Sequence, residues 1–203
     1  MRAARHSPAR SLAWATMTLL SLSIVLLASR YLTLDPDVFF PQQRAVYLAN
    51  TAAIVAHVVG GMLALLLGPI QFVPAIRRRW PRIHRWIGRG YLGGIALGGV
   101  AGLWMAQLAY GGPVAQLGFT GLALAWLTAS ATALLRIRAG DVAGHRAWMI
   151  RSFALTFAAV TLRLWLPLLA VVGVAFEPGY AAVAWLSWVP NLLVAEWIVR
   201  RAP

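Results

Sequence analysis

Apolar residues along this chain gather into six long runs, which short polar or charged segments separate. Each run approaches or exceeds the roughly twenty helical residues needed to cross the hydrocarbon core of a membrane. No segment between the runs is long or polar enough to form a soluble domain. The pattern predicts an all-α fold in which one domain, residues 1–203, is a bundle of six transmembrane helices near 11–29, 46–72, 89–110, 114–135, 152–174 and 181–199.

The composition also indicates an integral membrane protein. Hydrophobic residues make up 61% of the chain and charged residues 11%, whereas about a quarter of a soluble protein is charged. Eighteen basic residues oppose five acidic ones, but the basic residues lie between the apolar runs, so we expect no nucleic-acid partner. Because the sequence contains no cysteine, disulfides, thiolate metal sites and iron–sulfur clusters are excluded. A redox role would need a bound cofactor.

The basic residues are all arginines, and their positions predict the orientation of the bundle. The N-terminal arginines, the clusters within 77–89 and 136–151, and the C-terminal pair fall on one side of the predicted helices. Arg30 and Arg44 fall on the other side. Since arginine-rich loops stay in the cytoplasm, both termini are expected to be cytoplasmic. Phospholipid head groups of the bilayer are the expected partners of most of these arginines.

Four glycines repeat at intervals of four residues in the third run: Gly90, Gly94, Gly98 and Gly102. Residues four apart lie on one face of a helix, so this face should form a groove without side chains. Such a groove admits the backbone of a neighbouring helix or a flat ligand. It would equally allow two copies of the chain to form a homo-oligomer.

Three polar side chains are predicted at a similar depth inside the membrane. His57 lies near the middle of the second run, Arg163 in the fifth and Asn191 in the sixth. Because a charged group facing lipid at the bilayer centre costs about 2.5 kcal/mol or more, these residues should face the bundle interior. His57 is then either a ligand-binding or proton-handling group or a neutral, hydrogen-bonded histidine. Arg163 either pairs with a bound anion or propionate or acts as a structural hydrogen-bond hub.

The fifth and sixth runs carry two further local signals. Pro167 and Pro190 lie inside them and predict kinks in both helices. Glu196 lies near the inner end of the sixth run, too far from Arg163 to neutralise it. We expect Glu196 to pair with an arginine at the cytoplasmic end, namely Arg200, Arg146 or Arg151.

His84 and His145 lie near the cytoplasmic starts of the third and fifth predicted helices, at matched depth. Two histidines at one level on separate helices suit axial ligation of a haem iron, one nitrogen from each. The adjacent Arg85 and Arg146 could meet the haem propionates. Asp141 follows Gly140 and should cap the fifth helix, although it could instead orient His145.

This placement of histidines resembles the b561-type membrane cytochromes, in which histidines on four consecutive helices hold two haems. The resemblance implies that the second to fifth helices form a four-helix core and that the cofactor is haem b. The chain departs from the pattern because its fourth predicted helix contains no histidine and has Gly118 at the corresponding position. At most one bis-histidine site remains, and His57 is left without a partner.

Four segments carry a closer resemblance, which covers most of the chain. They read HVVGG at 57–61, GPIQF at 68–72, HRWIGRGY at 84–91, and GD followed by HRAWMIRS within 140–152. They are similar to the bacterial multi-pass membrane family called domain of unknown function 2306 (DUF2306). This resemblance implies the bacterial inner membrane as the location. The family has no settled activity, so the resemblance indicates fold and topology rather than chemistry.

Three functions are consistent with the sequence. The first is electron transfer through haem b held by His84 and His145, with a quinone or another redox partner near His57 and Arg163. The second is a small transporter or proton-coupled carrier that uses the predicted polar layer, and the third is a membrane scaffold or assembly factor. A hydrolase is not favoured, because the sequence shows no set of nucleophile, base and acid. An enzymatic role would be that of a membrane oxidoreductase component.

Overall fold

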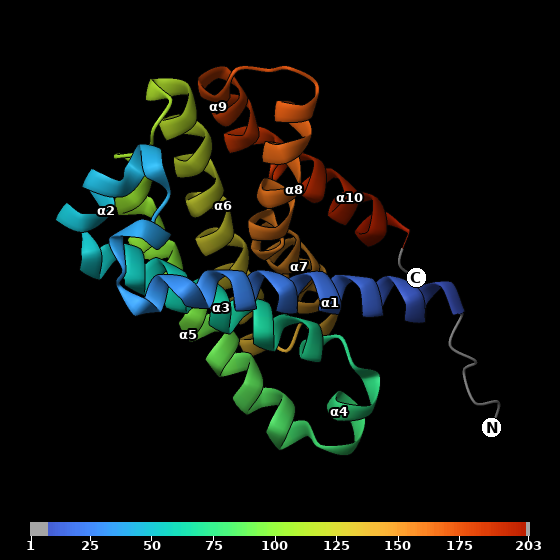
Figure 1. The fold of residues 1–203 in the computed structure, drawn as a ribbon. Coiled ribbons are helices and arrows are strands. Elements are labelled where there is room, and N and C mark those ends of the chain that lie inside the picture. The colour runs from blue at the N-terminus through green and yellow to red at the C-terminus, as the bar shows by residue number, and fades with distance from the viewer. Residues whose placement is uncertain (1–7, 202–203) are drawn as a thin grey trace.

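The computed structural model describes residues 8–201, and every regular element in this range is helical (Figure 1). The all-α prediction is confirmed. The helices are α1 (Pro8–Ser29), α2 (Arg44–Ala49), α3 (Thr51–Gln71), α4 (Pro74–Arg79), α5 (Pro81–Ala106), α6 (Gly112–Arg138), α7 (Val142–Thr156), α8 (Ala158–Val171), α9 (Phe176–Leu186) and α10 (Val189–Arg200). Three 3₁₀ turns, Arg30–Thr33, Pro36–Val38 and Pro41–Gln43, join α1 to α2.

Five helical segments of the described chain are long and apolar enough to cross a membrane: Ser11–Thr33, Thr51–Gln71, Gly112–Arg138, Val142–Val171 and Phe176–Arg200. They correspond to five of the six predicted spans, which confirms a multi-pass membrane fold. The sixth predicted span is α5, which is 26 residues long. It falls outside this group because its arginines and many glycines lower its mean hydropathy. The sixth crossing and the cytoplasmic position of the termini remain predictions.

The predicted boundaries need three corrections. The predicted span near 89–110 is part of a helix that begins at Pro81, and the span near 152–174 is part of one that begins at Val142, directly after the predicted Asp141 cap. Hydropathy marks where the apolar part begins, whereas these helices start earlier, at a proline in the first turn and at the Asp141 cap. The second predicted helix, 46–72, is interrupted at Asn50, which separates α2 from α3.

α3 and α5 pack with their backbones almost in contact. A methyl group added at Gly60 would lie 2.3 Å from the Gly98 backbone nitrogen, and one added at Gly94 would lie 2.9 Å from the Gly60 carbonyl oxygen. The predicted groove on α5 is therefore real, and α3 of the same chain fills it. α5 also packs against α6, and α6 against α7 and α9, while α1 crosses in front of α3 in Figure 1.

Large side chains between α5, α6 and α7 form the main core. Tyr91, Ile95, Trp126 and Phe153 are all buried there. The outward faces of the bundle remain strongly apolar: Leu26 of α1, for example, is 75% exposed. An extensive exposed apolar surface of this kind is what a lipid environment covers.

The last two spans are each broken near their middle. The α7–α8 span is interrupted at Phe157, and the α9–α10 span at Ser187 and Trp188. The second break directly precedes Pro190 and confirms the predicted kink, whereas α8 continues through Pro167 and its span breaks ten residues earlier.

Asn191 joins the two breaks. Its side-chain nitrogen lies 3.2 Å from the Ala154 carbonyl oxygen, 3.1 Å from the Thr161 hydroxyl and 3.0 Å from the Ser187 carbonyl oxygen. The Thr161 hydroxyl also donates to the Ser187 carbonyl. One amide thus satisfies polar groups that the interrupted helices expose within an apolar environment.

Candidate functional site

A cavity of about 350 Å³ lies between α3, α5, α6, α8 and α9. Leu155 and Thr156 line it from before the α7–α8 break, and Ala158 and Ala159 line it from after the break. The connection between α1 and α2, together with Tyr47 of α2, completes the wall. Most of the lining is apolar, and its polar or aromatic-polar side chains are Tyr31, Gln43, Tyr47, His57, Trp126, Thr156, Arg163 and Tyr180.

His57 is held against α5 with one ring nitrogen left free. Its Nδ1 lies 2.8 Å from the Gly98 carbonyl oxygen. Because a carbonyl only accepts hydrogen bonds, Nδ1 must carry the proton, and Nε2 of the neutral ring keeps its lone pair. Nε2 has no hydrogen-bond partner among residues 8–201. At position 102 an added methyl group would lie 2.7 Å from His57 Nδ1, so a side chain there would displace the His57 ring.

Arg163 brings a charge to the same cavity without a countercharge. Its Nη1 donates to the Ala159 carbonyl oxygen at 2.8 Å, one turn back along α8. No carboxylate within residues 8–201 forms an ion pair with it. Glu196 instead accepts two hydrogen bonds from Arg151, which is one of the three arginines predicted as its partner. A guanidinium has five N–H donors, so most of those on Arg163 remain available to a ligand.

The structure adds three tyrosines that the sequence reasoning missed. Tyr31, Tyr47 and Tyr180 line the cavity together with His57 and Arg163, although they lie far apart in the sequence. Tyr31 and Tyr47 pack with Phe39, and Tyr180 stacks on Phe40. The density of aromatic residues in the first predicted loop was the available signal. The aromatic contacts pack this loop against α2 and α9.

The predicted polar layer divides into two separate sites. His57 and Arg163 line the cavity, as expected for residues that face the bundle interior. Asn191 does not line the cavity; its side chain donates hydrogen bonds at the two helix breaks instead. The common depth was predicted from residue counts along each helix, which carry no information on the direction in which Asn191 points.

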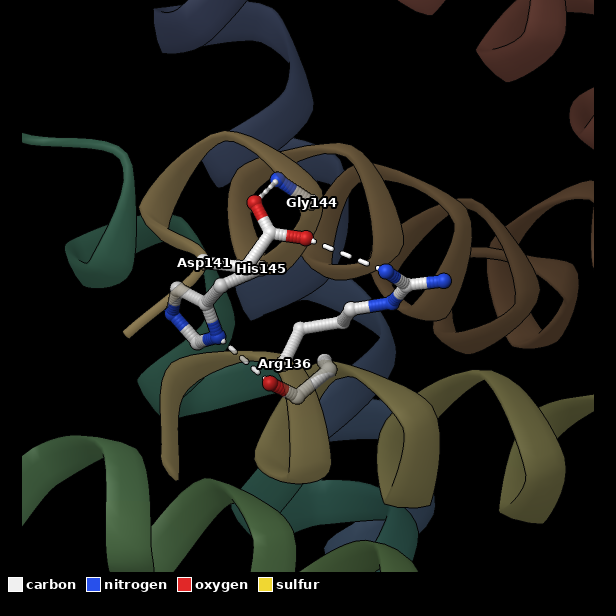
Figure 2. A network of polar contacts seen from close by, with 5 residues as sticks. Arg136, Asp141, Gly144 and His145 are labelled. Atoms are coloured by element: carbon white, nitrogen blue, oxygen red, sulfur yellow. Dashed lines mark hydrogen bonds and ion pairs between the residues drawn. The ribbon is translucent and has the colours of Figure 1, made fainter. Parts of the chain in front are cut away.

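His145 is oriented by a backbone carbonyl. Its Nδ1 lies 2.8 Å from the Ala133 carbonyl oxygen of α6, as Figure 2 shows. Asp141 does not bind this histidine: one carboxylate oxygen accepts from the Gly144 N–H at 2.7 Å, and the other accepts from Arg136 at 3.2 Å. The interpretation of Asp141 as a helix cap is therefore confirmed.

His84 is the second predicted haem ligand, and its Nδ1 is buried without a hydrogen-bond partner among the described residues. It lies before the apolar part of α5, where burial, together with Arg77 and His145, lowers the pKa of His84. A neutral imidazole is the form that binds iron. Neither His84 nor His145 lines the cavity around His57, and Arg85 and Arg146 are exposed.

The family model described as "Predicted membrane protein (DUF2306)" matches residues 54–199, from α3 through α10. The match includes every candidate site residue: His57, His84, Arg85, His145, Arg146 and Arg163. No curated protein and no solved structure matches the chain. Since the family model covers well over half of its length, the chain belongs to the DUF2306 family of predicted membrane proteins.

Proposed function

We propose that this membrane protein binds a small, largely apolar molecule that carries an anionic or strongly polarised oxygen. The molecule lies in the cavity between α3, α5, α6 and α8. Arg163 donates hydrogen bonds to its oxygen, and His57 Nε2 accepts or returns a proton beside it. The protein resides in the bacterial inner membrane with both termini in the cytoplasm, where it carries this molecule or exchanges electrons with it.

The observation that carries this proposal is the state of Arg163. An ionised side chain inside a membrane bundle is normally paired, because burying it without a partner costs several kcal/mol. Arg163 has one backbone acceptor and no carboxylate partner within residues 8–201. Arg163 lines a cavity that is large enough for a small ligand, and its remaining N–H groups are available there. A ligand oxygen would complete the hydrogen bonding of the guanidinium and offset its desolvation.

The cavity lining narrows the chemical class of the ligand. Alanine, glycine, leucine and aromatic side chains form most of the wall and suit an alkyl chain or a ring. Only Arg163 supplies a formal charge, so one anionic or polarised oxygen satisfies the site. A fatty carboxylate and a quinone both meet this description. A carboxylate would favour a carrier and a quinone would favour a redox role.

Binding of three probes to the detergent-purified protein tests this function: radiolabelled dodecanoate, decylubiquinone and the uncharged dodecanol. We expect dodecanoate or decylubiquinone to bind more tightly than dodecanol. Loss of charged hydrogen bonds in Arg163→Gln should weaken that binding about tenfold or more. His57→Gln should weaken it too, whereas Arg78→Gln, at an exposed position on α4, should bind like wild type. Equal binding of all three probes, or unchanged binding by Arg163→Gln, contradicts the proposal.

Haem ligation by His84 and His145 is the second candidate function. It is favoured by the buried, unpartnered Nδ1 of His84 and by His145, whose Nδ1 hydrogen bond leaves Nε2 free. These two nitrogens would be the axial ligands, and a bound haem b would supply one-electron transfer. The geometry favours it less than the cavity, since neither histidine lines a described cavity.

A dithionite-reduced minus oxidised visible spectrum of protein made with added haem precursor tests the second candidate. Haem binding predicts a sharp reduced α-band at near-stoichiometric haem. The band should be lost in His84→Ala and in His145→Ala and retained in His57→Ala. A flat spectrum from folded wild-type protein, or a band retained in both variants, contradicts haem ligation by this pair. A scaffold would show neither probe binding nor a haem spectrum.

A further inference from the structure

Three tyrosine side chains gather around Arg163 at the end of the cavity that lies opposite the arginine clusters. Tyr31 follows α1 and Tyr47 lies on α2, with their ring centroids 6.2 Å apart, and Tyr180 lies near the start of α9. Every pair among Arg163 and the three tyrosines is close enough for a direct electrostatic interaction. We call these four residues the donor cluster.

Most of the hydrogen-bonding capacity of the donor cluster is unused within residues 8–201. Arg163 uses one of its five N–H donors on the Ala159 carbonyl oxygen, so four remain. The hydroxyl groups of Tyr47 and Tyr180 form no hydrogen bond with this part of the chain. The Tyr31 oxygen faces the Phe40 backbone N–H, which leaves the phenol proton of Tyr31 free to donate.

The other polar groups that line the cavity already have a protein partner, apart from His57. Gln43 donates to the Leu108 carbonyl oxygen at 3.2 Å, and the Trp126 indole donates to Thr156 at 2.8 Å. His57 keeps one free acceptor, Nε2, because its Nδ1 is bound to α5. A ligand would therefore meet four N–H groups and three O–H groups as donors, and one nitrogen as acceptor.

A carboxylate or a quinone leaves much of this capacity unused. Each carbonyl group of a quinone offers one oxygen and a carboxylate offers two, and neither carries a proton for His57 Nε2. A phosphate monoester that keeps one proton offers three non-bridging oxygens and one O–H donor. Its oxygens accept hydrogen bonds from Arg163 and the tyrosines, while its O–H group donates to His57.

The charge of this ligand also matches the cavity. The second pKa of a phosphate monoester is about 6 in water, and an apolar environment disfavours the second negative charge. Among the described residues that line the cavity, only Arg163 carries a formal charge. The proton lies between a phosphate oxygen and His57 Nε2, and the filled site is electrically neutral whichever atom holds it.

We propose that the donor cluster and His57 bind the head group of a lipid phosphate monoester, a single phosphate on an apolar chain. This inference rests on the proposed function and narrows its ligand class, because the ligand must occupy the cavity beside Arg163. The apolar wall holds part of the chain. Bilayer phospholipids that are phosphodiesters do not satisfy the site, because they carry no phosphate proton for His57.

Binding of three further probes to the detergent-purified full-length protein tests this ligand class. The probes are dodecyl phosphate, dodecyl methyl phosphate and dodecanoate. Dodecyl methyl phosphate carries one negative charge but has no phosphate O–H group. We expect dodecyl phosphate to bind about tenfold more tightly than either of the others, because only dodecyl phosphate uses both the donor cluster and His57 Nε2.

Tyr47→Phe and Tyr180→Phe each keep the aromatic ring and remove one donor. Each should weaken the binding of dodecyl phosphate about fivefold or more, while the binding of dodecanoate changes less than about twofold. Tyr110→Phe is the matched control. Tyr110 packs against Tyr180, with ring centroids 6.2 Å apart, but does not line the cavity, so this variant should bind all three probes like wild type.

Variants are compared only when they elute from size exclusion like wild type, and either tyrosine variant decides the outcome if the other fails to fold. Equal affinity for dodecyl phosphate and dodecanoate, equal affinity for dodecyl phosphate and its methyl ester, or unchanged binding in the tyrosine variants overturns the lipid phosphate. The proposed function survives that result if the binding of dodecanoate or decylubiquinone still depends on Arg163. Binding of every probe that is unchanged by Arg163→Gln overturns both.

Discussion

Replacing Gly60 with alanine is expected to lower the free energy of unfolding by about 3 kcal/mol, the upper part of the range for overpacked cores. The added methyl group would lie 2.3 Å from the Gly98 nitrogen and 2.5 Å from the Gly94 carbonyl oxygen. These are backbone atoms, so no side-chain rotation relieves the clash. α3 and α5 must move apart, and the hydrogen bond from His57 to Gly98 would be strained with them.

Gly93→Ala is the matched control on the opposing helix. A methyl group there meets nothing within 4 Å, so the variant should be as stable as wild type or gain up to about 1 kcal/mol of helix propensity. Unfolding titrations in mixed micelles, with the same detergent for all three proteins, measure both effects. If Gly60→Ala and Gly93→Ala unfold at the same denaturant concentration, the close approach of α3 and α5 is wrong.

Arg163→Met is expected to make the protein more stable while it abolishes probe binding. Methionine removes a charge that has no ion-pair partner within residues 8–201. Removing the cost of burying an unpaired charge should raise the free energy of unfolding by about 1–3 kcal/mol, net of the lost bond to Ala159. Higher stability together with lost binding is the trade-off expected for a residue of a binding site. The same micelle titration, followed by the dodecanoate and decylubiquinone binding assay, measures both changes.

Arg151→Met provides the comparison with a paired arginine. Arg151 is held by both carboxylate oxygens of Glu196 across α7 and α10, so the same substitution should destabilise the protein by leaving Glu196 without its partner. Opposite signs for the two variants are the expected result. If Arg163→Met is also destabilising, the alternative prediction is correct and Arg163 is a structural hydrogen-bond hub.

Much of the fold could be read from the sequence because its signals are local. Hydropathy is a property of each residue, and a run of about twenty apolar residues is enough to identify a membrane helix. The spacing of Gly94 and Gly98 places both on one face of a helix whatever packs against it. An ionisable residue such as His57 or Arg163 within an apolar run must face the interior, because lipid offers it no partner. These two candidate site residues therefore followed from the sequence.

The remaining features depend on contacts between distant segments. The glycine groove does not specify its occupant, and only the packing shows that Gly60 of α3 fills it. Tyr31, Tyr47 and Tyr180 gather around Arg163 because three separate segments meet at the cavity.

The same limit applies to Asn191, whose partners lie at the breaks between α7 and α8 and between α9 and α10. The sequence by itself determined the membrane class, most of the helices and which polar groups must be shielded from lipid. Only the tertiary structure decided what shields them, because helix periodicity gives the face on which a residue lies but not the crossing and register that bring a partner to it.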